Sequence, residues 1–208
     1  MAKRSIKAMR RDELMDAAIA VIGEEGMANA TMAVIARRAG MSAGLVNHYF
    51  DSKEELIALA MRNVSNLFRQ DIMRLAPANP TPAQRLKAIV DGSFVPQHLG
   101  APKRAATWMQ FMIAAQTEPR IKHLYHLTGA RFVSNIRFAV RQLVPADKVD
   151  DIADGIAALI DGFFWQSAGE YEEEDTERAR RICWRYVCLL IPGIEGQPAD
   201  QAAHNDRS

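Results

Sequence analysis

The sequence lacks long apolar runs, has few cysteines and carries almost no net charge. No stretch approaches the roughly 18 apolar residues that cross a bilayer, and the first residues lack a signal-peptide core, so we expect a cytoplasmic protein. Cys183 and Cys188 are five positions apart and would point in different directions on a helix, which favours buried free thiols over a disulfide or a metal site. The formal net charge is only +1, so any affinity for nucleic acid must come from a local cluster of charge.

The sequence also lacks the alternating pattern typical of β-strands, and helix start signals recur instead. Residues 52–55 (SKEE) form a capping box that begins a long helix toward Leu75, and residues 81–84 (TPAQ) begin the next one with a threonine cap and a first-turn proline. We expect an all-α protein with further helices that begin at Pro102 and Pro119, that carry helical apolar spacing up to Pro145, and that cover about 152–170 and 176–191.

Residues 31–53 predict two short helices joined by a three-residue turn, the pattern of a helix-turn-helix. Thr31 is placed to cap a helix to about Ala39 that buries Val34 and Ile35. Gly40 can adopt the left-handed conformation that ends this helix, and Ser42 caps a second one. A polar and aromatic helix on a small rigid support fits the major groove of DNA.

The second short helix is predicted to be held by an apolar side and to expose the rest. Its expected anchors are Leu45, Val46 and Phe50. The residues left available for a partner are Ala43, Gly44, Asn47, His48 and Tyr49.

The first eleven residues are strongly basic, with five lysines and arginines, Arg10 and Arg11 among them, and no acid. Because a helix-turn-helix follows, DNA phosphate is the expected counter-ion of this arm. The alternative is a solvated, disordered start of the chain.

The first quarter of the chain closely resembles the DNA-binding domain of the tetracycline-repressor (TetR) family. Leu14, Ala17, Ala18, Val21 and Ile22 form the stripe of a first helix that Gly26 ends, and the resemblance continues through Ala30-Thr31, Ile35-Ala36, Ala39-Gly40, Ser42, Gly44, His48-Tyr49-Phe50 and Lys53. The resemblance implies that Thr31, Ser42, Tyr49 and Lys53 contact the DNA backbone. It also implies that Ala43, Gly44, Asn47 and His48 approach the bases.

Two positions depart from the family's pattern. Position 47 is often aromatic and here is Asn47, and Ala43 replaces a basic or hydroxyl residue. The operator sequence therefore cannot be inferred from the family. A carboxamide can pair bidentately with adenine in the major groove, and the alternative for Asn47 is a solvent-facing or capping side chain.

Length and composition leave room for a second, larger unit. With 208 residues and 49% hydrophobic content the chain can bury a sizeable core. We predict a DNA-binding domain over residues 1–55, a helical ligand-sensing and dimerisation domain over 56–192, and a disordered tail over 193–208 that is poor in apolar residues.

A glycine seam marks the helix that follows Pro145. Gly155, Gly162 and Gly169 repeat every seven residues with Ala158 near the same line, and helix-interior glycine costs about 1 kcal/mol each, so a close helix contact is expected in compensation. The next helix carries Ala179, Ile182, Cys183, Tyr186, Val187, Leu189 and Leu190 on one face and Arg178, Arg181 and Arg185 on the other. The pair resembles the helices through which TetR-family subunits dimerise. The alternative is that the glycines face a neighbour in the same subunit.

Aromatic and acidic residues of the larger domain are candidates for an effector site. On a helical wheel Ile152, Ile156 and Ile160 fall on one side of their helix, whereas Asp154, Asp161 and Trp165 fall opposite. An indole and a carboxylate together suit a cation. The expected effector residues are Trp108, Phe111, Tyr125, Asp161 and Trp165, with ordinary core positions as the alternative.

The run over 155–164 (GIAALIDGFF), with the helix of Trp108 before it, is similar to the choline-responsive repressors within the TetR family. This resemblance implies choline or its aldehyde as effector and no cofactor. The sequence thus predicts a dimeric repressor that binds a pseudo-palindromic operator and is released by a small molecule. A TetR-type regulator of another efflux or catabolic pathway is the alternative.

Two other classes have less support. His123 and His126 could share a metal on one helix face, but no third ligand is indicated, so we expect no metal and no enzyme. An architectural DNA-binding protein would not need about 150 residues of aromatic-bearing helical domain.

Overall fold

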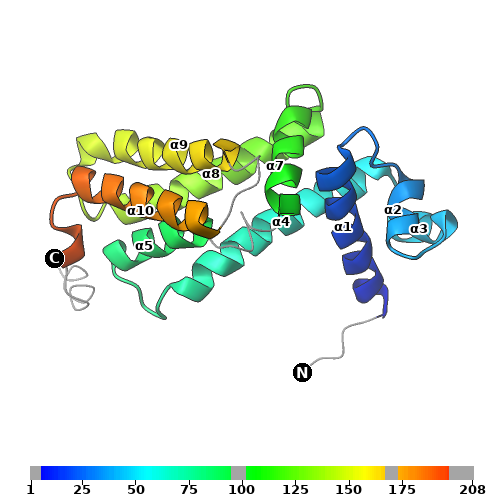
Figure 1. Ribbon diagram of the computed structural model, residues 1–208, viewed down its shortest axis with the longest axis horizontal. Helices are drawn as coiled ribbons and strands as arrows, with labels where there is room; N and C mark the ends of the chain where they lie inside the picture. The colour runs from blue at the N-terminus through cyan, green and yellow to red at the C-terminus, as the bar shows by residue number, and fades with distance from the viewer. Residues whose placement is uncertain (1–5, 95–101, 167–172, 197–208) are drawn as a thin grey trace. The chain divides into compact units, whose positions relative to one another are not determined.

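The computed structural model describes residues 6–94, 102–166 and 173–196, and every regular element within them is a helix (Figure 1). Its elements are α1 (Ile6–Glu25), α2 (Met32–Arg38), α3 (Ala43–Tyr49), α4 (Lys53–Leu75), α5 (Pro82–Ser93), α7 (Pro102–Ala114), α8 (Pro119–Val140), α9 (Val149–Gln166) and α10 (Glu173–Leu190), with short 3-10 turns η1 (Ala146–Lys148) and η2 (Ile194–Gly196). The predicted all-α class is confirmed. None of the described helices is both long and apolar enough to cross a membrane.

Local start signals decided where several helices begin. The side chain of Thr81 accepts the backbone N–H of Gln84, the Gln84 side chain accepts that of Thr81, and Pro82 occupies the first helical turn. At α4 the hydroxyl of Ser52 accepts the N–H of Glu55 at 3.1 Å, while the Glu55 carboxylate accepts the N–H of Asp51 at 2.8 Å. Both predicted helix starts are therefore confirmed.

Other boundaries differ from the prediction. α8 ends at Val140, and a turn follows in which the N–H of Leu143 donates to Val140. α9 and α10 begin three residues earlier than expected, at Val149 and Glu173, because first-turn acids extend each helix toward its N-terminus. Gly169 lies outside the described residues.

The chain divides into two compact units. The first comprises Met1–Leu67 and Ala101–Leu127, and the second comprises Phe68–Gly100 and Thr128–Ser208. This division differs from a boundary at residue 55 because α7 and the start of α8 belong with the N-terminal helices. The assignment of DNA binding to residues 1–55 stays a prediction.

The first unit is built around α1, whose most extensive partner is α7. The predicted stripe from Leu14 to Ile22 is buried, and Gly26, with φ of +84°, ends the helix. Two polar side chains of α7 reinforce the contact. The buried hydroxyl of Thr107 donates to the carbonyl of Ile19 at 2.8 Å, and the Gln110 side-chain oxygen accepts the N–H of Met27 at 3.4 Å.

The second unit packs α9 and α10 with α5 and the end of α8. Buried α9 residues include Ile152, Ile156 and Ile160, as the helical spacing predicts. Arg137 of α8 forms ion pairs with Asp150 at 2.7 Å and with Asp154 at 2.9 Å. These exposed ion pairs link α9 to α8 at the surface of the unit.

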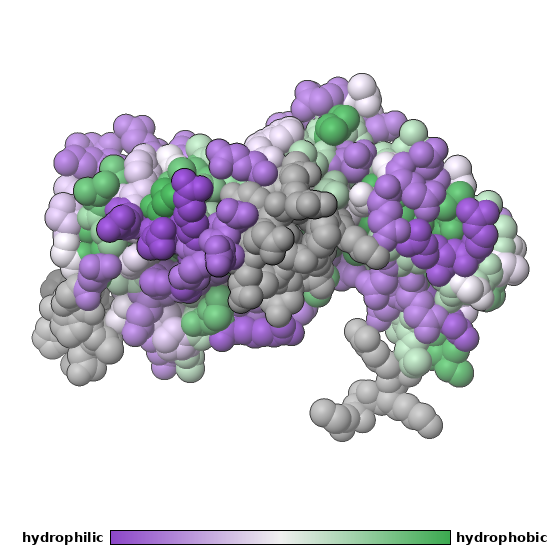
Figure 2. Space-filling model, in the orientation of Figure 1, coloured by the Kyte–Doolittle hydropathy of each residue, from purple (hydrophilic) through white to green (hydrophobic). Residues whose placement is uncertain are grey.

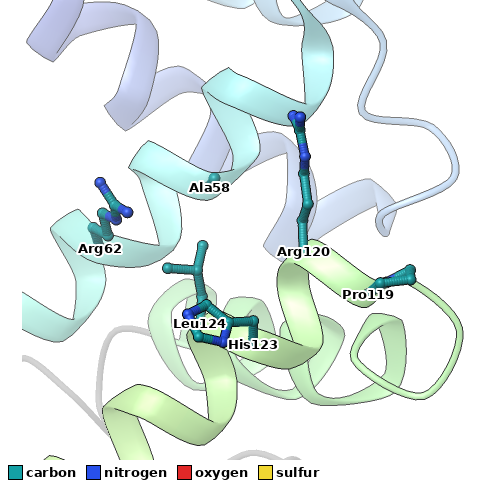
Figure 3. A pocket seen from close by; sticks show the side chains of 6 residues that line it. All are labelled: Ala58, Arg62, Pro119, Arg120, His123 and Leu124. Atoms are coloured by element: carbon teal, nitrogen blue, oxygen red, sulfur yellow. The ribbon is translucent and has the colours of Figure 1, made fainter.

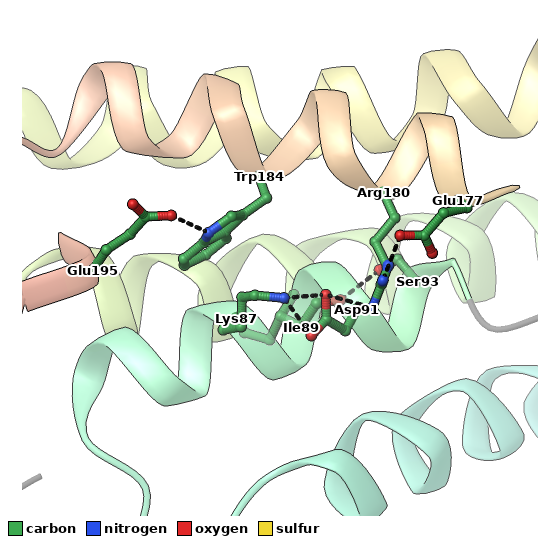
Figure 4. A network of polar contacts seen from close by, with 8 residues as sticks. All are labelled: Lys87, Ile89, Asp91, Ser93, Glu177, Arg180, Trp184 and Glu195. Atoms are coloured by element: carbon green, nitrogen blue, oxygen red, sulfur yellow. Dashed lines mark hydrogen bonds and ion pairs between the residues drawn. The ribbon is translucent and has the colours of Figure 1, made fainter. Parts of the chain in front are cut away.

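A polar network joins α5 to α10 on the same unit (Figure 4). Asp91 accepts from Lys87 at 2.6 Å and lies 3.7 Å from Arg180, which also pairs with Glu177. The Lys87 ammonium lies 5.1 Å from the centre of the Trp184 ring. Both cysteines are free thiols. Cys183 is buried as predicted, and burial raises the pKa of its thiol to about 12, whereas Cys188 is only half-buried.

The packed chain extends beyond the predicted start of the tail at residue 193. Ile194 is buried, and Glu195 accepts the indole N–H of Trp184 at 3.1 Å. The prediction of disorder was therefore wrong for residues 194–196, where one isoleucine and one acid found partners on the unit. Residues 197–208 lie outside the described part.

Candidate DNA interface and effector residues

The two short helices of the helix-turn-helix begin and end where the sequence predicts. The Thr31 hydroxyl accepts the N–H of Val34, and the Ser42 hydroxyl accepts the N–H of Leu45, each at 3.3 Å. Gly40 has φ of +67°, a backbone conformation that residues with a side chain rarely adopt. Caps at both helices compensate for their length of seven residues each.

The outer face of α3 is polar, with one apolar exception. Val46 and Phe50 are buried as predicted, but Leu45 is 37% exposed and is not an anchor, while Val34 of α2 is only half-buried. A seven-residue helix buries a narrow arc, which Met41 in the turn helps to fill. The exposed set is Ala43, Gly44, Asn47 and His48, with Tyr49 half-buried and its ring 5.4 Å from that of His48.

Arg11 supports α3 from within the first unit. Its guanidinium donates to the carbonyl of Tyr49 at 2.8 Å and lies 4.6 Å from the centre of the Phe50 ring, with Glu55 at 3.5 Å. These contacts account for Arg11 without DNA, and its predicted phosphate contact stays untested. Arg10 is exposed and pairs with Glu13 at 2.7 Å on the same helix.

The predicted backbone-binding residues already have intramolecular roles. Thr31 and Ser42 cap their helices, and the Lys53 ammonium donates to the carbonyl of Met27 at 3.4 Å across the C-terminal end of α1. Hydroxyl and ammonium groups keep further donors, so these contacts do not prevent binding to phosphate. Residues 1–5, the start of the basic arm, lie outside the described residues.

The predicted effector residues fall into two sets. In the first unit the rings of Trp108 and Tyr125 lie 5.7 Å apart at 36°, both half-buried, and the ring of His126 lies 6.0 Å from Tyr125. Phe111 is completely buried and packs as core. The first unit therefore joins two of the five residues into an aromatic pair.

Asp161 and Trp165 belong to the second unit, on the outer face of α9. Trp165 is 50% exposed, and the Asp161 side chain is also exposed, although desolvation by the surrounding protein raises the pKa of its carboxyl. Ala158 shares this outer face. The residues predicted for the effector and for dimerisation thus lie on one surface of this helix.

The glycine seam divides into two environments. A side chain at Gly155 would lie 3.3 Å from the Tyr186 hydroxyl of the same chain, which supports the interpretation of a neighbour within the subunit. A side chain at Gly162 would have nothing within 4 Å. The predicted apolar face of α10 also divides. Ala179, Cys183 and Val187 are buried, whereas Ile182, Tyr186 and Leu189 are exposed.

Two family models match the chain at the positions of these elements. The model "Bacterial regulatory proteins, tetR family" matches residues 14–60, and the model "BetI-type transcriptional repressor, C-terminal" matches residues 82–192. The chain belongs to the TetR family of bacterial transcriptional regulators. Members of this family are regulators and not enzymes, so the enzyme alternative is excluded.

Curated relatives of this TetR-family regulator carry the name HTH-type transcriptional regulator BetI. The protein from Rhizobium meliloti is 38% identical over 164 residues, 79% of this chain and 80% of the relative. The protein from Escherichia coli K12 is 32% identical over 194 residues and covers 92% of this chain and 99% of the relative. The predicted likeness to choline-responsive repressors is thereby confirmed as a BetI-type relationship.

Solved structures share the fold at lower identity. A TetR-family regulator from Rhodococcus has a TM-score of 0.78 at 20% identity and covers 88% of this chain and 99% of its own. A transcriptional regulator from Saccharomonospora viridis in complex with choline has a TM-score of 0.73 at 22% identity and covers 86% and 96%. The second structure shows that this fold accommodates choline in that protein.

The sequence analysis of this TetR-family regulator missed Thr107 and Gln110. Thr107 binds α1, Gln110 binds the turn that follows it at Met27, and both flank Trp108 on α7. Two polar residues three apart on an apolar helix were the available signal, since that spacing places them on one face. Their partners lie 88 and 83 positions away, which no local pattern reveals.

Proposed function

We propose that this regulator represses transcription as a homodimer on a pseudo-palindromic operator and that a choline-like quaternary amine releases it. The observation that carries the proposal is the BetI-type match over residues 82–192, which includes the Trp108–Tyr125 pair. DNA binding, dimerisation and effector recognition each have separate support.

The exposed face of α3 supports base recognition. Asn47 and His48 offer hydrogen-bonding groups, and the exposed Leu45 offers an apolar contact of the kind a thymine methyl accepts. Arg11 holds the C-terminal end of α3 through the Tyr49 carbonyl. A short helix that is fixed at both ends presents these groups without further ordering.

Exposed apolar side chains support the dimer. Ile182, Tyr186 and Leu189 lie along α10, and Leu189 is 79% exposed. The outer face of α9 adds Ala158, the open space at Gly162 and Trp165. Exposed Arg178, Arg181 and Arg185 lie beside this stripe, and Figure 2 shows a strongly hydrophilic surface over α10 in its view. An apolar stripe with a charged margin is typical of an interface between two copies.

The aromatic pair on α7 and α8 supports a cationic effector. Ring faces attract a quaternary ammonium, and each desolvated contact contributes about 2 kcal/mol to binding. The two half-buried rings of Trp108 and Tyr125 can therefore supply part of the binding free energy of such a cation. The neighbouring His126 ring extends this aromatic group. The participation of Asp161, Trp165 and Phe111 stays a prediction to be tested residue by residue.

α7 also supports a route from effector to DNA. Trp108 lies directly beside Thr107, and Gln110 follows two residues later, so a ligand that displaces the Trp108 ring acts on the helix that binds α1. α1 in turn holds α3 through Arg11. Release requires that the effector bind the released state more tightly, and a tenfold preference supplies about 1.4 kcal/mol.

The DNA part is tested by footprinting and salt-dependent binding. Two protected half-sites with centres about 34 Å apart or a little more are expected. Asn47→Ala should cost roughly 1 to 3 kcal/mol at one base position, and Lys53→Ala should weaken all sequences alike with a salt slope reduced by about 1. A footprint on one asymmetric half-site would contradict the dimer on its operator.

The effector part is tested by calorimetric titration of choline, betaine aldehyde and glycine betaine with and without operator DNA. Choline should bind, operator DNA should weaken it by the factor by which choline weakens operator binding, and Trp108→Ala should remove the response. Asp161→Asn and Phe111→Leu then assign the remaining residues separately. If no quaternary amine changes DNA affinity, the regulator senses another compound.

A further inference from the structure

An open cleft in the first unit is lined by α4 and by the start of α8 (Figure 3). Its volume is about 400 Å³, and its lining residues are Ala58, Arg62, Pro119, Arg120, His123 and Leu124. This volume lies within the range of about 300 to 1,000 Å³ that is usual for small-molecule sites. None of the predicted effector or DNA-binding residues lines it.

Helical spacing brings the lining residues together. Ala58 and Arg62 are four apart on α4, and Arg120, His123 and Leu124 share one face of α8. Figure 3 shows the Arg62 and Arg120 side chains on either side of Ala58. The floor is apolar because Leu124 is buried and Ala58 and Pro119 carry no polar group.

The cleft holds basic side chains that no described residue neutralises through an ion pair. Arg62, Arg120 and His123 are exposed, and none forms an ion pair or hydrogen bond with the described part of the chain. By contrast, Arg38 of the same unit pairs with Glu24 at 2.6 Å and with Glu25 at 3.2 Å. No acid is among the lining residues, and Glu54, one turn before Ala58 on α4, interacts electrostatically with Arg120 without forming an ion pair. Two guanidinium groups and an imidazole are therefore available to bind an anion.

The chemistry of these groups selects the ligand. A guanidinium presents a planar fork of donors that matches a carboxylate or a phosphate group, and the start of α8 adds the partial positive charge of a helix N-terminus. The apolar floor makes no favourable contact with a small hydrated ion, but it can bury an apolar group of a ligand. Anion and apolar body must therefore belong to one molecule.

We propose that this cleft binds a small organic anion, a carboxylate or a phosphate monoester that carries an apolar group. The anionic group lies between Arg62 and Arg120, and the apolar group lies on Ala58, Pro119 and Leu124. The proposal does not depend on the choline-like effector.

Isothermal titration calorimetry of the full-length protein with benzoate and phenyl phosphate tests the site, and the two probes distinguish carboxylate from phosphate recognition. Inorganic phosphate lacks the apolar group and benzyl alcohol lacks the charge, so both should bind at least about tenfold more weakly than the better probe. Equal binding of inorganic and phenyl phosphate would overturn the role of the floor.

Variants tie the binding to the cleft. Arg62→Ala and Arg120→Ala should each weaken the better probe at least about tenfold, whereas Arg69→Ala, an exposed arginine of α4 outside the cleft, should leave it unchanged. Ala58→Glu places a carboxylate between the two guanidiniums and should abolish binding, with helicity checked by circular dichroism. Failure of both probes to bind below about 10 mM, or affinity unaffected by the two arginine variants, would overturn the proposal.

Discussion

The exposed faces of α3 in the first unit and of α10 in the second differ in kind. α3 exposes Asn47 and His48 and buries Val46, whereas α10 exposes Ile182 and Leu189 beside a buried Cys183. Water covers a polar face at no cost, but an exposed leucine forfeits about 1.5 to 3 kcal/mol of burial. The difference indicates two kinds of partner. The polar face suits hydrated DNA, and the apolar stripe suits a surface like itself.

The strongest test of this comparison gives the apolar stripe a charge. Leu189→Asp should convert the dimer to monomer and abolish operator binding while the helices stay folded, because this side chain is 79% exposed within the subunit. Gly162→Leu should act likewise, since its side chain meets open space in the subunit but would meet a partner in the dimer. Analytical ultracentrifugation should report half the native mass.

Leu75→Asp is the matched control because Leu75 is also exposed, on α4, away from the stripe. It should remain dimeric and bind operator normally. A Leu189→Asp protein that stays dimeric would show that the two copies meet elsewhere.

Two helical glycines sharpen the distinction between contacts inside the subunit and open surface. A side chain at Gly92 would lie 2.6 Å from Cγ1 and 2.9 Å from the Cα of Ile72, so Gly92→Ala should lower the free energy of unfolding by about 1 to 3 kcal/mol. Gly129 meets nothing within 4 Å, and Gly129→Ala should raise it by up to about 1 kcal/mol. Urea denaturation measures both, and equal stability of the two variants would contradict the close helix crossing.

Arg11 tests whether the polar face of α3 depends on support from behind. Arg11→Ala removes the hydrogen bond to the Tyr49 carbonyl and should cost about 1 kcal/mol of stability, since the arginine is partly exposed. Arg10→Ala, which breaks an exposed pair, should cost less than about 0.5 kcal/mol. Unchanged stability with a reduced salt slope would make Arg11 a DNA contact instead.

The smallest expected effect concerns Asp161 on the outer face of α9. Because desolvation raises its pKa in the folded state, the folded protein binds this proton more tightly than the unfolded chain, and the stability it contributes decreases as pH rises from the ordinary value of 3.8 through the raised one. Asp161→Asn should therefore melt like the wild type below pH 3.8 and at a slightly higher temperature than the wild type at neutral pH, by a small margin because the side chain is exposed. A difference in melting temperature that is constant with pH would contradict this origin.

Sequence patterns predicted the elements whose causes are local. The caps at Thr31, Ser42, Ser52 and Thr81 hold because each hydroxyl bonds an N–H three residues away. The helix break at Gly40 likewise needs only its own backbone. Local signals alone are therefore sufficient to predict the helix-turn-helix.

Features that depend on contacts between distant parts of the chain could not be predicted from local sequence patterns. Leu45 looked like an anchor because it is apolar, but the buried arc of α3 is centred on Val46 and Phe50. The glycine spacing was visible, yet whether Gly155 faces a second subunit or Tyr186 depends on how α9 packs. The same holds for Trp108 and Tyr125. The sequence predicted each of them as an effector residue, but their contact with each other depends on how α7 packs against α8.

The hydrogen bond from Thr107 to the carbonyl of Ile19 bears on how such regulators can be recombined. A chimera that joins the DNA-reading helices of one family member to the sensing helices of another after residue 60, where the N-terminal family model ends, would give α1 a foreign α7. The transplanted DNA-reading helices would lose their hydrogen bonds to Thr107 and Gln110. The chimera should therefore be less stable and should respond less well to its effector. A chimera that exchanges the DNA-reading helices should therefore transfer both segments of the first unit, residues 1–67 and residues 101–127.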